Sequence, residues 1–451
     1  MAFKVSKFGG TSTATRAQLE KCLDIILSDE DRRFAVFSAP GARFDGDIKV
    51  TDLLKNAAQS YLKTGSIDNS IYREIMSRYE ELIPEDVQLL DFLDKKLSTN
   101  LRCMAIPNYL EVVMASGEED IAFIASSVLT RRGIDNNLFD TKKIGFLIEG
   151  EGDNRSPHIS CYERMRKYLL RENHRVGVET GYYGVDEKGN LTVLPRGGCD
   201  TSGTAVARAV GAEICENYTD EDGLKRAHPK IVHDAETIPK VTRREIRALT
   251  YMGFKLQDRC LMPLIGTNIV LNVRNTNNPS HLGTMIVDFR EVNTEERIVG
   301  VACVKANISI DTVKYYIEDD VGYGRTFLQQ IENAKVPYEH TPDDVDGMSV
   351  VLDEAKLRSR ISLEELVQNI KDAVNPDEIG TTPVAIMSLT GLGIANHFDV
   401  EYRAAKSLAD QKIKLLVMDK GPKSLSIVLG VSPERAADAV RAVYYEFFPR
   451  K

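Results

Sequence analysis

The chain of 451 residues lacks the features that define several common classes of protein. No hydrophobic run is long enough to cross a lipid bilayer, and the N-terminus reaches Lys4 and Lys7 without the apolar core of a secretion signal. The seven cysteines are scattered, with no Cys-x-x-Cys pair and no Cys/His spacing of a zinc site. They indicate reduced thiols, and we therefore expect a cytoplasmic protein with no membrane partner.

An excess of positive charge is also missing. The chain has 58 Lys and Arg against 67 Asp and Glu, a formal net charge of −9. This balance argues against a nucleic-acid partner, so a bound nucleotide would need a locally basic pocket. Four cations are candidates for that pocket: Lys7, Arg196, Lys225 and Lys255. The length and the 43% hydrophobic content are enough for roughly two to four domains.

A glycine-containing turn follows the first apolar run of the chain, in the segment Lys7-Phe8-Gly9-Gly10-Thr11-Ser12. Because Gly9 and Gly10 have no Cβ atoms, the backbone can approach an anion closely. The N–H groups at the start of the following helix point towards that anion, and Lys7 adds a positive charge. The segment is neither a Walker A loop nor G-x-G-x-x-G, and the alternative is an ordinary tight turn with a solvated lysine.

A second turn of this kind is Arg196-Gly197-Gly198-Cys199-Asp200, which precedes a helical pattern at residues 206–212. Arg196 offers a planar fork for a carboxylate or phosphate, and Asp200 offers an anion that can hold a lysine or a metal. Alternatively the two residues form only a surface ion pair, which contributes little stability. The presence of two charged Gly-Gly turns favours an anion-binding site.

Six motifs follow one another along the chain: Lys7-Phe8-Gly9-Gly10-Thr11-Ser12, Val50-Thr51-Asp52-Leu53-Leu54, Ser116-Gly117-Glu118, Gly181-Tyr182-Tyr183-Gly184, Arg196-Gly197-Gly198-Cys199-Asp200 and Tyr218-Thr219-Asp220. The set resembles the monofunctional aspartate kinases (aspartokinases) of the amino-acid kinase family, over the whole chain. This resemblance implies an α/β protein. It would have an amino-acid kinase fold, a mostly parallel sheet between helix layers, followed by two ferredoxin-like (ACT) βαββαβ units.

The alternation of strand and helix patterns agrees with that fold. We predict strands at residues 34–38, 144–148 and 175–179, helices at 17–27 and 121–130, and a helical insertion near the substrate site at 60–110. In the C-terminal third we predict, among others, a helix at 363–374 and a strand at 413–418. The predicted domains are a catalytic domain at 1–292 and ACT domains at 297–382 and 383–451.

The resemblance implies ATP-dependent phosphorylation of the side-chain carboxylate of L-aspartate, the first step of the pathway to lysine, threonine and methionine. A carboxylate with a reference pKa of about 3.9 is already a nucleophile at neutral pH, so no general base is needed. The obstacle is the charge of the transferring phosphoryl group, which fixed cations, backbone N–H groups and Mg²⁺ can neutralise. We therefore expect ATP and Mg²⁺ as cofactors, with no metal ligands predicted among the side chains.

Site residues are assigned by the motifs that match the family. The catalytic residues are Lys7 and Asp200, with Asp200 organising Lys7. The substrate-binding residues are Thr51, Glu118, Tyr182, Arg196 and Cys199. Arg196 would bind the α-carboxylate of aspartate and Glu118 its α-ammonium group. The ATP-binding residues are Lys7, Gly9, Gly10, Ser38, Thr219, Asp220, Lys225 and Lys255. The structural alternatives are a helix N-terminal charge for Glu118 and an N-cap for Thr51.

The chain departs from the family pattern at two of these positions. Lys225 replaces a tyrosine that would pack against the nucleotide, and Cys199 stands where a serine is usual, which removes a good hydroxyl donor. Both changes are expected to affect rate or affinity without changing the reaction class.

The two ACT units imply a homodimer or larger homo-oligomer and an amino-acid effector. Lys414 replaces an asparagine of the family's effector-binding strand, and Pro422 and Lys423 interrupt the polar turn that follows it, so we expect the second unit to serve mainly for pairing. The effector would then bind the first unit, at Gly322, Tyr323, Gly324, Tyr338 and Glu339. The alternative is that these are turn and edge-strand residues without a ligand.

Two other functions stay open at this point. One is a kinase for another carboxylate amino acid, such as glutamate or N-acetylglutamate. The other is a catalytically weak paralogue that senses amino acids, although the presence of Lys7, Glu118, Arg196 and Asp200 argues against it.

Overall fold

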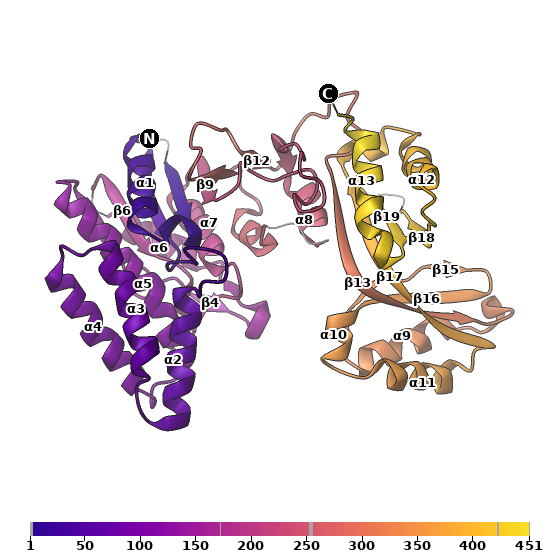
Figure 1. Ribbon diagram of the computed structural model, residues 1–451, viewed down its shortest axis with the longest axis horizontal. Helices are drawn as coiled ribbons and strands as arrows, with labels where there is room; N and C mark the ends of the chain where they lie inside the picture. Colours follow the sequence, from indigo (N-terminus) through magenta and orange to yellow (C-terminus); the bar gives the residue numbers. More distant parts are fainter. Residues whose placement is uncertain (1–2, 172, 252–255, 422–423, 451) are drawn as a thin grey trace. The chain divides into compact units, whose positions relative to one another are not determined.

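Two β-sheets organise the chain in the computed structural model, which describes residues 3–171, 173–251, 256–421 and 424–450 (Figure 1). Each sheet belongs to one of two units. The first unit comprises Met1–Leu224, Thr237–Arg243 and Leu256–Arg290, and the second comprises Lys225–Glu236, Arg244–Lys255 and Glu291–Lys451. Two short internal segments and the last two residues of the predicted catalytic domain, 1–292, thus belong to the second unit. The domain boundaries stay a prediction.

The first unit is built on a mostly parallel sheet of strand order β10-β12-β11-β9-β1-β2-β6-β3. The strands are β1 Lys4–Phe8, β2 Arg32–Phe37, β3 Asn136–Phe139, β6 Val176–Thr180, β9 Ile214–Thr219, β10 Lys240–Thr242, β11 Val270–Asn275 and β12 Thr284–Val287. Strand β1 lies between β9 and β2 and is parallel to both. Its residues after Lys4 are all buried, as expected for a parallel strand covered on both faces. The predicted α/β fold class is confirmed.

Helices accompany this sheet. They are α1 Arg16–Leu27, α2 Val50–Thr64, α3 Asn69–Leu82, α4 Val87–Arg102, α5 Tyr109–Arg131, α6 Cys161–Leu169 and α7 Gly198–Val210. The predictions of helix at 17–27 and 121–130 and of strand at 34–38 and 175–179 are confirmed by α1, α5, β2 and β6. No helix in the described ranges is both long enough and apolar enough to span a membrane.

The predicted helical insertion at 60–110 consists of the end of α2, then α3 and α4, which pack on one another and on α5 (Figure 1). Aspartates at the N-caps begin two of these helices. Asp68 accepts hydrogen bonds from the N–H groups of Ser70 and Ile71, and Asp86 accepts one from Leu89. Such caps satisfy backbone donors that have no partner within the helix, and they define where α3 and α4 start.

The strand predicted at residues 144–148 is wrong. Ile144 and Phe146 are buried, as their alternation suggests, but Gly145 between them adopts a φ of +81° in a turn. A left-handed residue at the centre interrupts an extended strand. Only the two residues of β4, Ile148–Glu149, pair with β5, Ser156–Pro157. The alternation of apolar residues therefore indicated buried side chains but not an extended β-strand backbone.

The second unit contains the other sheet, of order β14-β16-β13-β17-β19-β18, with β15 on β16. Its strands are β13 Gly300–Val313, β14 Tyr338–His340, β15 Asp343–Asp344, β16 Gly347–Asp353, β17 Glu378–Thr390, β18 Val417–Asp419 and β19 Ser426–Val431. The helix at 363–374 is confirmed as α11. The strand predicted at 413–418 is wrong for most of its length, because only β18 is extended.

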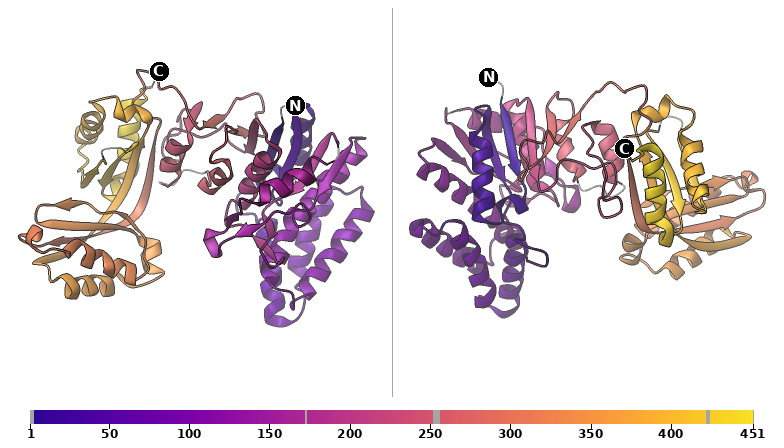
Figure 2. Two further views of the ribbon diagram at one scale, coloured as in Figure 1. Left: turned by 180° about the vertical axis from the view of Figure 1, so that it is seen from behind. Right: turned by 45° about the horizontal axis from the view of Figure 1, so that its top comes forward.

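Helices of the second unit fall into two groups. They are α9 Tyr323–Asn333, α10 Glu354–Arg358, α11 Leu363–Val374, α12 Val400–Asp410 and α13 Ala436–Phe447, and α8 Arg243–Tyr251 lies almost wholly in this unit. Helices α9 and α11 lie side by side, as do α12 and α13 (Figure 2). The remaining short elements are β7 Tyr183–Val185, β8 Leu191–Val193 and the 3₁₀ turns η1 Gly10–Thr13, η2 Gly152–Asn154, η3 Asp258–Leu264, η4 Ile317–Asp319, η5 Leu392–Ala395 and η6 Pro433–Arg435.

The two halves of this sheet share the long antiparallel strands β13 and β17. Ile308 and Ile310 of β13 belong to the core under α9 and α11, whereas Val301 of the same strand belongs to the core under α12 and α13. The pairing of β13 with β17 shifts register between Val304 and Asn307, where one half passes into the other. The predicted boundary at residue 382 therefore falls inside β17.

Candidate active site

The carboxyl ends of three neighbouring parallel strands meet at one edge of the first sheet. Strand β1 runs into Gly9 and Gly10, β2 into Ser38 and β9 into Asp220. Backbone hydrogen bonds tie these ends together, since the N–H of Gly9 donates to Tyr218 O (3.0 Å) and that of Ser38 to Phe8 O (3.0 Å). Ligands of open α/β sheets bind at this edge. The tertiary structure thus brings together the predicted phosphate turn and Ser38.

Lys7 and Asp200 form a buried ion pair at this edge. Lys7 lies near the end of β1, and Asp200 lies in the first turn of α7. Their side chains are only 7% and 16% exposed. Burial alone would lower the pKa of Lys7, but the adjacent Asp200 carboxylate outweighs it and the pKa is raised. The ammonium group of Lys7 therefore stays charged, and Asp200 is not the surface partner of Arg196.

Asn217 is a site residue that sequence reasoning missed. It lies on β9 in register with Lys7 of β1, and its Nδ2 donates to Asp200 Oδ1 (3.3 Å). The side chain is buried, and its Oδ1 accepts no hydrogen bond from any described residue. A buried polar atom without a partner is rare and needs a ligand or water. An asparagine inside a buried parallel strand is the signal that could have identified it.

Close packing explains two of the glycines. A Cβ on Gly203 of α7 would lie 2.9 Å from the Cβ of Lys7, and one on Gly41 would lie 2.6 Å from the carbonyl carbon of Gly10. Both contacts are shorter than a real Cβ tolerates. Gly203 lets α7 approach β1 closely enough for Asp200 to reach Lys7, and Gly41 lets the loop after β2 pack on the phosphate turn.

Glu118 lies in the middle of α5, so the alternative of a helix N-terminal charge is wrong. Its side chain is buried, and Oε2 has no hydrogen-bond partner among the described residues. Burial raises the pKa of Glu118 to about 8, although the Ala39 backbone N–H and the charge of Lys7 act in the opposite direction. The substrate-free site therefore holds a carboxyl group that titrates near neutral pH.

Tyr182 and Cys199 lie against the second glycine turn. Tyr182 has a φ of +77°, and its N–H donates to Ser202 Oγ (3.0 Å), a contact the sequence did not suggest. A Cβ on Gly198 would lie 2.9 Å from the ring of Tyr182, so the ring covers the turn. Burial raises the pKa of Cys199 to about 12, with the Ser38 side chain hydrogen-bonded to it. Cys199 is therefore a neutral thiol.

Arg196 and Thr51 are more accessible. Arg196 is exposed in the turn before α7 and forms no ion pair with any residue of the described ranges. Thr51 is half-buried at the second position of α2, and the N-cap of that helix is Lys49, so the N-cap alternative for Thr51 is wrong.

The predicted ATP-binding residues do not all lie in one unit of the structure. Gly9, Gly10, Ser38, Thr219 and Asp220 belong to the strand ends already described, and Thr219 Oγ1 accepts from the N–H of Glu221 (3.1 Å). Lys225 belongs to the second unit, and Lys255 lies outside the described residues. Where side chains are described, no three His, Cys, Asp or Glu residues lie close enough together to hold a metal ion.

The predicted effector residues lie at the start of α9 and in the edge strand β14. Gly322 is the N-cap of α9, with a φ of +100°, and Tyr323 is buried in the core beside Phe327. Gly324 packs towards Met348, Tyr338 is half exposed, and Glu339 pairs with Lys356 (2.9 Å). Pro422 of the second unit lies outside the described residues. Effector binding stays a prediction.

Comparisons with known proteins agree with this geometry. A family model described as "Amino acid kinase family" matches residues 2–275. The chain is 31% identical to aspartokinase 3 of Bacillus subtilis, covering 99% of this chain and 98% of that protein. The crystal structure of Clostridium acetobutylicum aspartate kinase matches at a TM-score of 0.88 and 28% identity, covering 99% of this chain and 100% of that one. E. coli aspartokinase III, solved with aspartate and ADP, shares the fold at a TM-score of 0.73 and 20% identity over 99% of this chain and 100% of that one.

Proposed function

The chain belongs to the amino acid kinase family, among the aspartokinases, and on that basis we propose how its residues transfer the γ-phosphoryl group of ATP to L-aspartate. The reaction joins a side-chain carboxylate oxygen of aspartate to phosphorus and breaks the bond to the β-phosphate, giving 4-phospho-L-aspartate and ADP. The observation that carries the proposal is the buried Lys7–Asp200 pair beside the Gly9-Gly10 turn.

The residues at the sheet edge neutralise the negative charge of the phosphoryl group and do not remove a proton from the substrate. The aspartate carboxylate is already ionised, so its attack needs alignment and neutralisation of the phosphoryl oxygens. Lys7 supplies a fixed positive charge, and the glycine turn supplies the N–H of Gly10, since the N–H of Gly9 already donates to Tyr218 O. Asp200 holds Lys7 in position and keeps it protonated, and Asn217 donates a hydrogen bond to Asp200.

Mg²⁺ fits this site as a partner of the nucleotide phosphates. The ion prefers oxygen ligands and is usually bound through one or two carboxylates together with substrate phosphates. The side-chain oxygens available here are those of Asp200 and the unpartnered Oδ1 of Asn217. When bound, the ion supplies positive charge to the phosphate oxygens.

Arg196 is proposed to bind the α-carboxylate of aspartate with two parallel hydrogen bonds. Arg196→Lys is then not conservative, because a point charge cannot reproduce the planar fork. We expect the KM for aspartate to rise about tenfold, from the loss of one charge-assisted hydrogen bond, with the KM for ATP unchanged. Initial rates measured against each substrate test this. A rise in the KM for ATP alone would place Arg196 on the nucleotide side.

Glu118 is proposed to accept the α-ammonium group of aspartate, which requires its ionised form. Because its pKa in the free protein is raised to about 8 from an ordinary 4.5, kcat/KM for aspartate should rise with pH up to about 8. Below that pH, aspartate binding should release about one proton, measurable by calorimetry in buffers of different ionisation enthalpy. Glu118→Gln should weaken aspartate binding and abolish the proton release. A proton release that persists in this variant would assign it to another group.

The reaction itself is tested by following ADP release with a panel of amino acids. We expect turnover with aspartate and little or none with glutamate or N-acetylglutamate, together with formation of an acyl phosphate trapped by hydroxylamine. An absence of aspartate-dependent ADP release would contradict the proposal: release with another amino acid would indicate the other kinase, and release with none would leave the amino-acid-sensing alternative.

Regulation is proposed to act through the first half of the second sheet. Its support is the edge strand β14, where Tyr338 is half exposed, whereas the predicted turn of the other half lacks the family's polar residues. The effector would be an amino acid, and the protein would form a homo-oligomer. Titration of lysine, threonine and methionine, singly and in pairs, while rate and subunit mass are followed, tests both proposals.

A further inference from the structure

Helix α5 carries three acidic residues in succession, Glu118, Glu119 and Asp120, of which only the last two form ion pairs within the part of the chain that the structure describes. Lys96 of α4 forms ion pairs with both, and its Nζ lies 2.8 Å from Glu119 Oε2. The Lys96 side chain is 16% exposed and that of Asp120 2%. A single buried lysine therefore bridges the two carboxylates next to Glu118 along the chain.

Three further contacts satisfy the other oxygens of Glu119 and Asp120 and complete this charge cluster. Lys142 lies 3.0 Å from Glu119 Oε1, and the Tyr183 hydroxyl donates to the same oxygen (2.7 Å). The Tyr79 hydroxyl donates to Asp120 Oδ2 (2.9 Å). Two lysines thus face two carboxylates. Burial would raise the pKa of Glu119, but the lysines lower it to about 2, whereas the pKa of Asp120 stays raised by burial despite Lys96.

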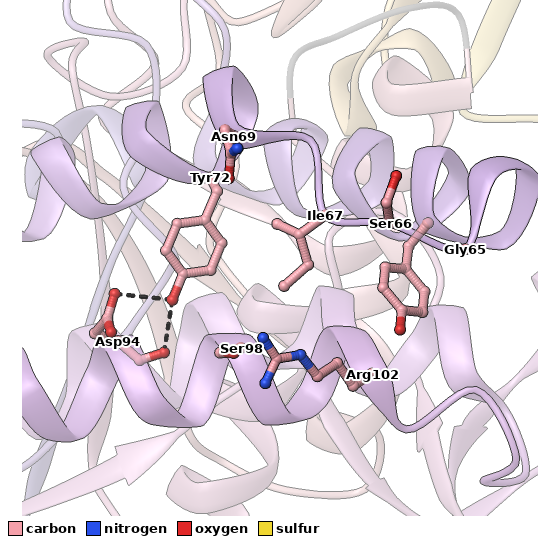
Figure 3. Close-up of a pocket in the computed structure, with 9 residues that line it drawn as sticks. Gly65, Ser66, Ile67, Asn69, Tyr72, Asp94, Ser98 and Arg102 are labelled. Atoms are coloured by element: carbon pink, nitrogen blue, oxygen red, sulfur yellow. Dashed lines mark hydrogen bonds between the residues drawn. The ribbon is translucent and has the colours of Figure 1, made fainter.

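The position of Lys96 depends on the contacts that hold α4 against its neighbours. The Tyr72 hydroxyl of α3 donates to both the backbone oxygen and Oδ1 of Asp94 on α4, each at 2.8 Å (Figure 3). On the inner side, Leu93 and Leu97 of α4 are buried in the core of this unit. These contacts hold the helix in place on both sides of Lys96. The insertion therefore places the positive charge of Lys96 beside Glu119 and Asp120, although none of the matched motifs lies in α4.

We propose that Lys96 is a positioning residue for substrate binding: by pairing with Glu119 and Asp120, it leaves Glu118 as the carboxylate that accepts the α-ammonium group of aspartate. The inference rests on the proposed function. Without Lys96, the buried cluster would carry one uncompensated negative charge. In a low-dielectric interior this charge opposes the ionisation of a neighbouring carboxyl group.

The ionisable groups that act on Glu118 come from several elements of the first unit. They are Lys7 of β1, Tyr79 of α3, Tyr182 after β6, Cys199 of α7 and Asp120 of its own helix. The tyrosine hydroxyls and the thiol are neutral at neutral pH, because burial raises the pKa of each. Lys7 and Asp120 are thus the charged groups in this set, and the charge of Asp120 is compensated by its ion pair with Lys96.

The test compares Lys96→Met with the wild type in ADP-release assays at varied aspartate concentration between about pH 6.5 and 9. Met keeps an apolar stem near the ring of Phe123, over which Lys96 lies. We expect the KM for aspartate at pH 7.5 to rise about tenfold, kcat to change less than about threefold, and the pH midpoint of kcat/KM to move up by about one unit. Lys96→Arg should restore most of the affinity.

Lys95→Met is the matched control, because Lys95 is exposed on the same helix and forms its ion pair with Asp91, a residue outside the cluster. It should leave all parameters unchanged. The double variant Lys96→Met/Asp120→Asn removes the uncompensated charge and should return the KM for aspartate to within about threefold of wild type. Asp120→Asn alone should move the pH midpoint down, which keeps the inference testable if Lys96→Met does not fold.

Three results would overturn the inference: an unchanged KM and pH profile in Lys96→Met, an equal loss of affinity in the double variant, or an unchanged midpoint in Asp120→Asn. A loss of kcat at constant KM would show a purely structural role for Lys96, which also contradicts it. If the wild type itself does not turn over aspartate, the proposed function fails instead.

Discussion

Lys7→Met is expected to lower kcat by about 10³-fold or more, with far smaller changes in the KM for either substrate. Lys7 is the buried cation at the end of β1, beside the Gly9-Gly10 turn, and its charge is needed most when negative charge moves onto the transferring phosphoryl group. Steady-state rates of ADP release at saturating aspartate and ATP test this. Turnover near that of the wild type would remove Lys7 from the mechanism.

The stability of this variant separates a catalytic loss from an unfolded protein. Removing one partner of a buried ion pair costs about 3–5 kcal/mol, although Asp200 keeps some exposure and its bond from Asn217. The double variant Lys7→Met/Asp200→Asn removes both charges. Its Tm should lie closer to that of the wild type than the Tm of Lys7→Met, while its kcat stays low. Recovery of activity in the double variant would mean that Lys7 serves only to neutralise Asp200.

Asp200→Asn is expected to lower kcat by at least about a hundredfold, with a smaller effect on aspartate binding. The substitution keeps the shape of the side chain but removes the charge that raises the pKa of Lys7 and holds its ammonium group. The rate and the KM for aspartate, measured over the same pH range as for the wild type, test this.

The pH dependence distinguishes two roles of Asp200. If its role is electrostatic, as proposed, the pH–rate profile keeps both limbs of the wild-type profile at a reduced height. If Asp200 carries a proton during the reaction, the variant loses one limb, and the electrostatic role is wrong. Asn217→Ala, which removes the hydrogen bond to Asp200 Oδ1 without changing a charge, is the control for misplacement of the carboxylate.

Local chemistry determined what could be predicted from the sequence. The glycines of the two turns, the lysine and aspartate beside them and the patterns of α1, α11 and β6 depend on residues that are close along the chain. Helical periodicity and turn chemistry are properties of such short segments. The pairing of Lys7 with Asp200 was also predicted, but through the resemblance to a family and not through local physics.

Only the tertiary structure decided the contacts between distant segments. Asn217 reaches Asp200 because β9 lies in register beside β1, and Lys96 reaches Glu119 because α4 packs on α5. The sharing of β13 between two cores likewise follows from packing that no local pattern records. In each case the deciding interaction is the burial of a polar group or an apolar side chain against a partner far away in the sequence, and the register of that partner is set by the whole fold.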